Sequence, residues 1–198
     1  MRKLKPNVLI NDRVAFQPGL GDYGVFEQQI PGENKMRPWE SCMTFNNSWG
    51  YTTDQNWKST KQIIHHLSDI VSKGGNLILN VGPDGNGVLS KDYEIRLDSV
   101  GKWMKLYGES IYGCEISNLL QPEWGRITTR GNKLYLHVFD WPEDGKLIIK
   151  QLNSKLKSAF LLKDITKINI KFTDQGQCLL LPSNVPDPVD AVVVIELN

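Results

Sequence analysis

Apolar residues recur at helical spacing in two segments of the chain. The first segment follows Ser59-Thr60-Lys61-Gln62, a capping-box pattern, and stops at Gly74-Gly75, a glycine pair typical of a helix end. The second runs from about Ser90 to Gly108 and carries two acidic residues in its first turn, where they favour a helix start. The apolar positions are Ile63, Ile64, Leu67, Ile70 and Val71 in the first segment and Ile95, Leu97, Val100, Trp103, Met104 and Tyr107 in the second. Both segments are predicted to be amphipathic helices.

Two short apolar runs lie in the same part of the chain. Asn7–Asn11 follows a predicted helix tail, Met1–Lys5, and the helix breaker Pro6, and Asn76–Val81 lies between glycines; both are predicted to be buried strands. Residues 11–56, rich in glycine, proline and aromatic residues, are predicted to form a long loop, and such loops are usually functional. Because strands alternate with helices, we expect a parallel sheet with crossover helices, as in the last part of a (β/α)8-like barrel.

After Tyr112 the pattern changes to short alternating or apolar runs. They are Arg126–Thr129, Lys133–Phe139, Lys146–Leu152, Ala159–Lys163, Ile168–Phe172, Cys178–Leu181 and Ala191–Leu197, with turn signals between several of them. Short strands at this spacing predict an antiparallel β-sandwich. The fold class is therefore α/β followed by all-β. We expect two domains, residues 1–113 and 114–198, with a boundary near Gly113.

Charge and composition exclude several function classes. With 23 Lys and Arg against 22 Asp and Glu, the net charge is +1, which provides no long-range attraction for nucleic acid. The longest apolar stretches, such as Ala191–Ile195, are far shorter than the roughly 20 residues that span a bilayer, so we expect no membrane span. Cys42, Cys114 and Cys178 are widely spaced and are expected to be free thiols. The sequence contains no metal-ligand cluster or phosphate-binding glycine loop, and we expect neither a metal nor a cofactor.

Candidate chemistry gathers in the predicted loop. Carboxylates lie there among aromatic residues, at Asp22, Glu27, Glu33 and Glu40. Aromatic rings pack on the C–H faces of sugars and carboxylates transfer protons, so the pattern is compatible with sugar chemistry. Arg13, directly after the predicted strand 7–11, could hold a polar substrate by paired hydrogen bonds or form a salt bridge at the barrel rim. From these residues alone, solvated carboxylates and a structural ion pair are the simpler interpretation.

A series of short motifs covers most of the first 113 residues. They are Leu9–Arg13, Gly21–Tyr23, Glu27–Pro31, Trp39–Thr44, Ser48–Tyr51, Asp69–Pro83 and Gly108–Gly113. In residue type, order and spacing they resemble the motifs of glycoside hydrolase family 29, the α-L-fucosidases. No individual motif in residues 114–198 matches, but the resemblance implies a C-terminal β-sandwich there.

The resemblance implies a retaining glycosidase and assigns roles to three residues. Glu27 falls at the position of the general acid/base, which protonates the leaving oxygen and later activates water. Arg13 matches a position near the substrate, and Trp49 matches an aromatic residue that lines the fucose pocket. The implied partner is a fucosylated glycan or glycoconjugate. Relatives are commonly secreted, periplasmic or lysosomal, although the apolar run in residues 1–11 is too short for a signal-peptide core.

The nucleophile of the family has no matching motif here. In the family it is an Asp in a Trp-x-Asp context on an earlier barrel strand, so we expect it upstream of this sequence; Asp12 and Asp22 do not match it. The first interpretation is a fucosidase fragment that lacks its nucleophile. The second is a non-catalytic carbohydrate-binding or interaction module that uses Trp49, Trp57 and the sandwich surface. The third is a fragment completed by the missing N-terminal barrel half or by assembly as a homo-oligomer.

Overall fold

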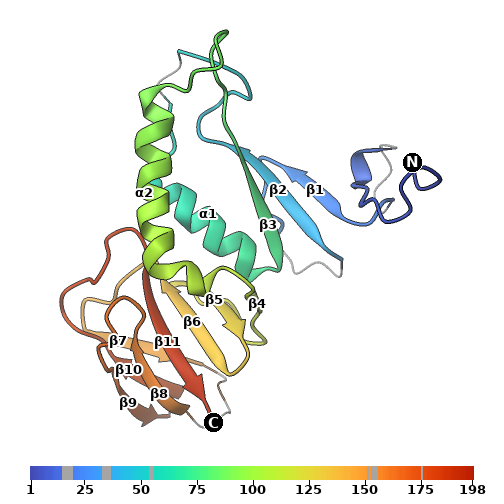
Figure 1. The fold of residues 1–198 in the computed structure, drawn as a ribbon. Coiled ribbons are helices and arrows are strands. Elements are labelled where there is room, and N and C mark those ends of the chain that lie inside the picture. Colours follow the sequence, from blue (N-terminus) through green and yellow to red (C-terminus); the bar gives the residue numbers. More distant parts are fainter. Residues whose placement is uncertain (15–19, 33–36, 54–55, 151, 153–155, 175) are drawn as a thin grey trace.

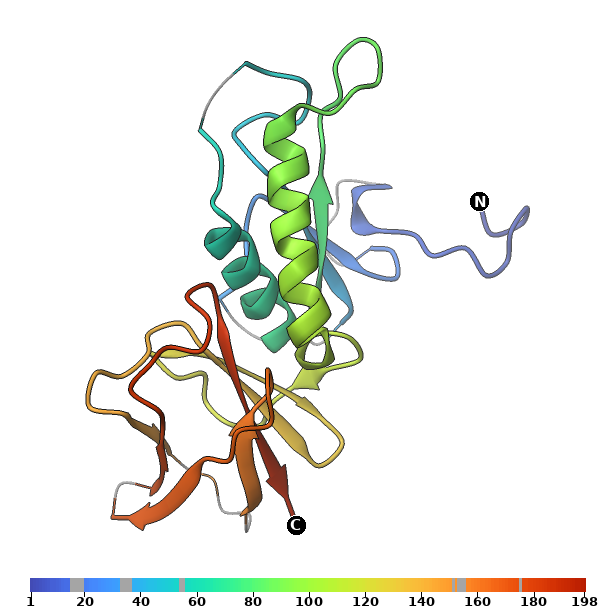
Figure 2. The same cartoon turned by 60° about the vertical axis from the view of Figure 1, so that its left-hand side comes forward.

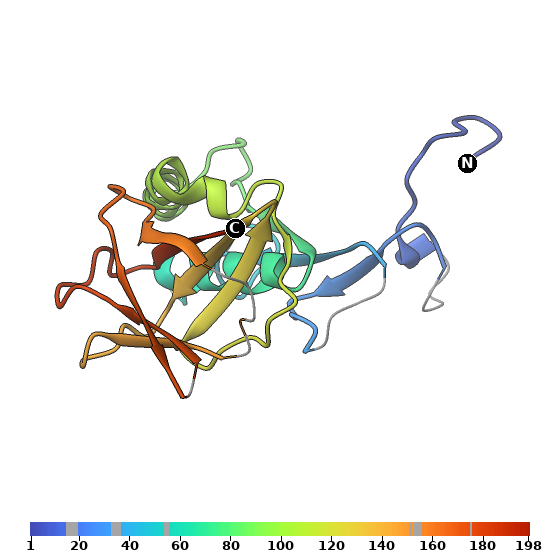
Figure 3. The ribbon, with the colours of Figure 1, turned by 90° about the horizontal axis from the view of Figure 1, so that it is seen from below.

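Two helices lie between a parallel sheet and a pair of antiparallel sheets (Figure 1). A computed structural model of the protein describes residues 1–14, 20–32, 37–53, 56–150, 152, 156–174 and 176–198. The elements of the first half are η1 (Asp12–Val14), β1 (Gly24–Glu27), β2 (Trp39–Thr44), α1 (Thr60–Ser72), β3 (Gly75–Asn80), α2 (Lys91–Tyr107) and η2 (Gly108–Ser110). The N-terminal segment extends to the side, away from the antiparallel sheets (Figure 3).

The parallel sheet has the strand order β1-β2-β3, and α1 forms the crossover from β2 to β3. Its packing against α1 is apolar, with Trp39 and Met43 of β2 buried against Ile70. The predicted capping box is present, because Ser59 Oγ accepts a hydrogen bond from the Gln62 amide while the Gln62 side chain accepts one from the Ser59 amide. α2 likewise lies between Ser90 and Gly108, so the predictions of both helices are confirmed.

Residues 1–11 form neither the predicted helix tail nor the predicted strand. Met1–Lys5 makes only a turn, and Asn11 pairs with Tyr23 in an isolated parallel bridge. Hydrogen bonds with Asp22 replace regular strand pairing. The Ile10 amide donates to Asp22 Oδ2 at 2.8 Å, and the Asp22 amide donates to the Ile10 carbonyl. The strand prediction was wrong because an apolar run needs a paired neighbour, and β1 begins only at Gly24.

The prediction of a continuous loop over residues 11–56 was also wrong, because β1 and β2 lie inside it. β2 pairs in parallel with β3 along its whole length. Trp39 and Met43 point toward α1, so alternation directs Glu40 and Cys42 to the opposite face. Because that opposite face is polar, no continuous apolar run marked the strand in the sequence.

The second half forms two antiparallel sheets (Figure 2). Apolar side chains of both sheets pack in one core. The larger sheet has the order β4 (Glu115–Ile116), β5 (Gly125–Arg130), β6 (Lys133–Val138), β11 (Ala191–Leu197) and β8 (Leu156–Leu161). The smaller has the order β7 (Lys146–Ile149), β10 (Gly176–Leu180) and β9 (Asn169–Thr173). Each strand predicted after Tyr112 is present; β8 begins at Leu156 rather than Ala159, and the two-residue β4 was not predicted.

A buried polar cluster joins α1 to the larger antiparallel sheet. His137 Nδ1 lies 2.8 Å from Asp190 Oδ2, and Ser68 Oγ of α1 donates to the same oxygen at 2.9 Å. Thr128 Oγ1 lies 3.4 Å from the other ring nitrogen of His137. Apolar side chains that include Trp103 surround the cluster. The helices and the larger sheet therefore share a core as well as these polar contacts.

Candidate active site at the strand ends

The carboxyl ends of the three parallel strands meet at one edge of the sheet, the edge where α/β folds hold their ligands. Glu27 ends β1, Thr44 ends β2 and Asn80 ends β3. The strand register pairs Glu27 with Cys42, and Cys42 with Ile78. Paired residues on parallel strands point to the same face, so these side chains share the face turned away from α1.

Arg13 and Glu27 form an ion pair at this edge, with Arg13 Nη2 at 2.9 Å from Glu27 Oε2. Asp12 fixes the start of η1, because its carboxylate accepts a hydrogen bond from the Val25 amide and pairs with Arg37 at 2.5 Å. The Arg13 and Glu27 side chains are 46% and 47% exposed. An ion pair this exposed contributes at most about 1 kcal/mol to stability. Both side chains of the pair remain open to solvent.

Arg13 also contacts the polar face of the parallel sheet, the face turned away from α1. Its guanidinium donates to Cys42 Sγ at 3.5 Å. Burial raises the pKa of the Glu40 carboxyl above its usual value, and the positive charge of Arg13 opposes that rise. Burial likewise raises the pKa of the Cys42 thiol, which disfavours the reactive thiolate. Cys42 thus lies on this face beside Glu27, and Glu40 lies two residues deeper along the strands, beside Val25.

Trp49 lies on the loop between β2 and α1, and 41% of its surface is exposed. Asn80 at the end of β3 donates its side-chain N–H to the Trp49 carbonyl at 2.7 Å. Gly82 allows the loop to approach, since a Cβ there would lie 2.4 Å from the Gly50 carbonyl group. The loop is therefore held at the carboxyl edge while the indole stays accessible.

The other predicted carboxylates have structural partners or lie outside the description. Asp22 accepts the Ile10 amide and pairs with Arg2 at 2.6 Å, and these contacts lower the pKa of its carboxyl. Asp12 is engaged by Arg37. Glu33 lies outside the described residues. Among the described carboxylates of this region, Glu27 is the one that the structure leaves both exposed and at a strand end.

Sequence reasoning missed the residues that support this edge. Gln28 directly follows Glu27 with a positive φ of 53°, and its side chain donates to Thr44 Oγ1 at 2.7 Å. Asn80 holds Trp49 as described. The available signal was position: polar residues that end parallel strands gather at one edge.

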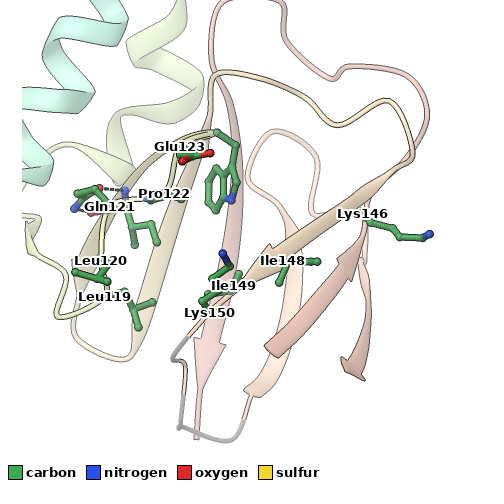
Figure 4. A pocket seen from close by; sticks show the side chains of 11 residues that line it. Leu119, Leu120, Gln121, Pro122, Glu123, Lys146, Ile148, Ile149 and Lys150 are labelled. Atoms are coloured by element: carbon green, nitrogen blue, oxygen red, sulfur yellow. Dashed lines mark hydrogen bonds between the residues drawn. The ribbon is translucent and has the colours of Figure 1, made fainter. Parts of the chain in front are cut away.

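The larger cavity lies far from these residues in sequence. It measures about 490 Å³, lies in the antiparallel half between residues 119–124 and β7, and has Glu123 as its single carboxylate among the described lining residues (Figure 4). Glycoside hydrolysis normally uses two carboxylates, so this cavity does not fit that chemistry. A smaller cavity of about 340 Å³ is lined by Arg13 and by residues 8–11. It borders the strand-end site.

Metal-ligand clusters and membrane-spanning helices are both absent from the part of the chain that the structure describes. Its His, Cys, Asp and Glu side chains form no group of three or more suited to a metal ion. None of its helices is long and apolar enough to cross a bilayer. The three cysteines are free, as predicted.

These features define an α/β protein with a carboxylate at its parallel strand ends, followed by an all-β portion. A family model described as Alpha-L-fucosidase matches residues 1–109, which is more than half of the 198 residues. The chain belongs to the α-L-fucosidase family.

Individual relatives cover the antiparallel half as well. The α-L-fucosidase of Dictyostelium discoideum is 30% identical over 97% of this chain and 45% of its own length. The tissue α-L-fucosidase of Rattus norvegicus is 32% identical over 79% of this chain and 36% of its own length. The structure of α-L-fucosidase isoenzyme 1 from Paenibacillus thiaminolyticus matches with a TM-score of 0.91 and 36% identity, over 100% of this chain and 52% of that one. The chain thus spans about half or less of the length of these relatives.

Proposed function

We propose that this chain is the C-terminal part of an α-L-fucosidase, a retaining glycosidase that releases L-fucose from fucosylated glycans. In this proposal residues 1–113 are the last part of a (β/α)8 barrel and residues 114–198 are a β-sandwich domain. The parallel order β1-β2-β3 with its α1 crossover supports the first assignment. Two antiparallel sheets around one core support the second.

The observation that carries the proposal is the exposed Arg13–Glu27 pair at the carboxyl ends of parallel strands. Glu27 is the general acid/base: it protonates the glycosidic oxygen as the bond to fucose breaks, and its carboxylate then takes a proton from the water that releases the sugar. Because Arg13 binds Oε2, it leaves the other carboxyl oxygen free to face the leaving group. Trp49 offers an exposed indole against which the apolar side of the sugar packs.

The retaining route needs a second carboxylate about 5–5.5 Å from the first. Asp12 and Asp22 are held by arginines and backbone amides, which argues against either as the nucleophile. We therefore assign the nucleophile to the N-terminal barrel half. A related structure from Bacteroides thetaiotaomicron, 27% identical with a TM-score of 0.89, is described as a trapped covalent intermediate. A covalent glycosyl intermediate is what a retaining mechanism requires.

A carbohydrate-binding module without hydrolysis is the second candidate. Exposed Trp49 and Tyr51 favour it, because aromatic rings at a surface can hold sugars. Trp57 does not contribute to such a surface: its ring packs edge-on against Tyr93 at 4.8 Å, and Arg96 covers it. The candidate surface therefore lies on the loop after β2.

An assay for release of nitrophenol from p-nitrophenyl α-L-fucoside distinguishes hydrolysis from carbohydrate binding without hydrolysis. The chain alone is assayed beside the chain joined to an upstream barrel half, and each is compared with its Glu27→Gln variant. We expect activity in the joined protein and a loss on the order of 100-fold or more with Glu27→Gln, the usual contribution of a general acid/base. The matched control is Glu94→Gln on the exposed surface of α2.

Activity in the chain alone that depends on Glu27 would contradict the assignment of the nucleophile to the other half. Saturable sugar binding without turnover in either form would favour the binding module.

A further inference from the structure

Gln28 adopts a backbone conformation that residues other than glycine rarely take. Its φ is 53°, and among the described residues Ile165 is the other non-glycine residue with a positive φ. Such conformations cost free energy and persist where the surrounding contacts maintain them. Gln28 directly follows Glu27, so the unusual conformation lies beside the proposed acid/base.

The positive φ changes the direction of the Gln28 side chain. In an extended strand Gln28 would point to the face opposite Glu27, beside Phe26 and toward α1. Instead its amide group reaches Thr44, which shares the face of Glu27 and Cys42 by the alternation of β2. Glu27, the last residue of β1, and Gln28, directly after it, thus act on the same polar face.

The contacts of Gln28 form a clamp on the end of β2. Its backbone N–H donates to the Cys42 carbonyl at 2.9 Å. Its side-chain Nε2 donates to Thr44 Oγ1 at 2.7 Å, and Thr44 N–H makes a longer bond of 3.4 Å to its Oε1. Thr44 is fully buried, whereas Gln28 itself is exposed, so the clamp links the exposed edge of the site to a buried partner.

The clamp continues into the loop that carries Trp49. The Thr44 hydroxyl donates to the Asn46 carbonyl. Lys58 Nζ donates to the Thr44 carbonyl at 2.7 Å and to the Asn46 carbonyl at 3.3 Å. A continuous set of hydrogen bonds therefore runs from Gln28, the residue after Glu27, to the start of the Trp49 loop.

We propose that Gln28 is a positioning residue that fixes the Glu27 carboxyl relative to the Trp49 loop by clamping Thr44. The inference rests on the proposed function, because it concerns the aim of Glu27 at the leaving oxygen. A carboxyl misplaced by about 1 Å can cost on the order of 100-fold in rate. The loss falls on proton transfer, so it depends on how much the leaving group needs a proton.

The test compares two substrates in the active, full-length protein. Phenyl α-L-fucoside has a poor leaving group that needs protonation, whereas dinitrophenyl α-L-fucoside has a leaving group that departs without it. The main variant is Gln28→Gly, because glycine accepts the positive φ without strain and only the clamp is lost. Gln29→Ala is the matched control: Gln29 is exposed, and the described contacts of this residue involve only its backbone carbonyl.

We expect Gln28→Gly to lower kcat/KM by on the order of 100-fold for the phenyl fucoside and by less than about 10-fold for the dinitrophenyl fucoside. Thr44→Val removes the other half of the clamp, so it should give the same pattern and add little in the double variant. Equal losses on both substrates, or no loss, would overturn the positioning role while leaving the proposed function intact. A parent protein inactive on both substrates would overturn the proposed function and this inference together.

Discussion

Removal of the Asp190 carboxylate should destabilise the protein more than most single changes. Asp190 and His137 are fully buried, and Asp190 Oδ2 accepts hydrogen bonds from His137 at 2.8 Å and from Ser68 at 2.9 Å. Bonds to a charged acceptor contribute about 1.5–3 kcal/mol each, so the two together amount to about 3–6 kcal/mol. Breaking a buried pair by deleting one partner costs a similar amount, about 3–5 kcal/mol, because the other group remains buried without its partner.

The assay is urea unfolding of Asp190→Ala beside the parent protein, followed by circular dichroism. A loss of about 3–5 kcal/mol corresponds to a fall in Tm of roughly 6–20 °C for a chain of this size. Asp190→Asn is the matched control, since it keeps the shape and one acceptor oxygen and should lose less. A loss below about 1 kcal/mol for Asp190→Ala, at an unchanged slope on urea, would refute the argument that the cluster joins α1 to the larger antiparallel sheet.

Three further predictions concern stability. Gly101→Ala in α2 should raise stability by about 0.5–1 kcal/mol, because a Cβ there meets open space, whereas Gly75→Ala should lower it by about 1–3 kcal/mol because its Cβ would lie 2.4 Å from Trp39; urea midpoints measure both. Hydrogen bonds from Lys133 and Tyr135 hold the pKa of the Glu109 carboxyl below its usual value. Its contribution is therefore present above pH about 4.5 and lost as pH falls through the lowered pKa, so Glu109→Gln should lower Tm at pH 7 and have little effect in strong acid.

The helices could be predicted because their signals are local. The capping box Ser59–Gln62 and the terminating glycines of α1 lie next to the apolar positions they delimit, and the structure reproduces them. The antiparallel strands were predictable for a similar reason, since turn residues separate alternating runs such as Lys133–Val138. Local patterns fail where a strand serves a site: β2 carries polar residues on the site face, which made it look like a loop.

Long-range contacts were beyond local patterns. Arg13 and Glu27 were selected by motif, but the 2.9 Å contact between them arises from the packing of η1 against β1. The sequence did not indicate a role for Gln28, because a positive φ on glutamine has no sequence signature. His137 and Asp190 are 53 residues apart, and neither stands in a recognisable pattern. Polar residues that depend on tertiary partners are the ones that sequence alone did not reveal.

The central claim, that the strand ends hold a fucose site built on Glu27, is tested most directly by a crystal structure of the full-length protein with a fucose-configured iminocyclitol. The account predicts the inhibitor against the Trp49 indole, with a Glu27 carboxyl oxygen within about 2.6–3.2 Å of the position of the glycosidic oxygen. An inhibitor bound instead in the 490 Å³ cavity of the antiparallel half, with Glu27 facing bulk water, would contradict it.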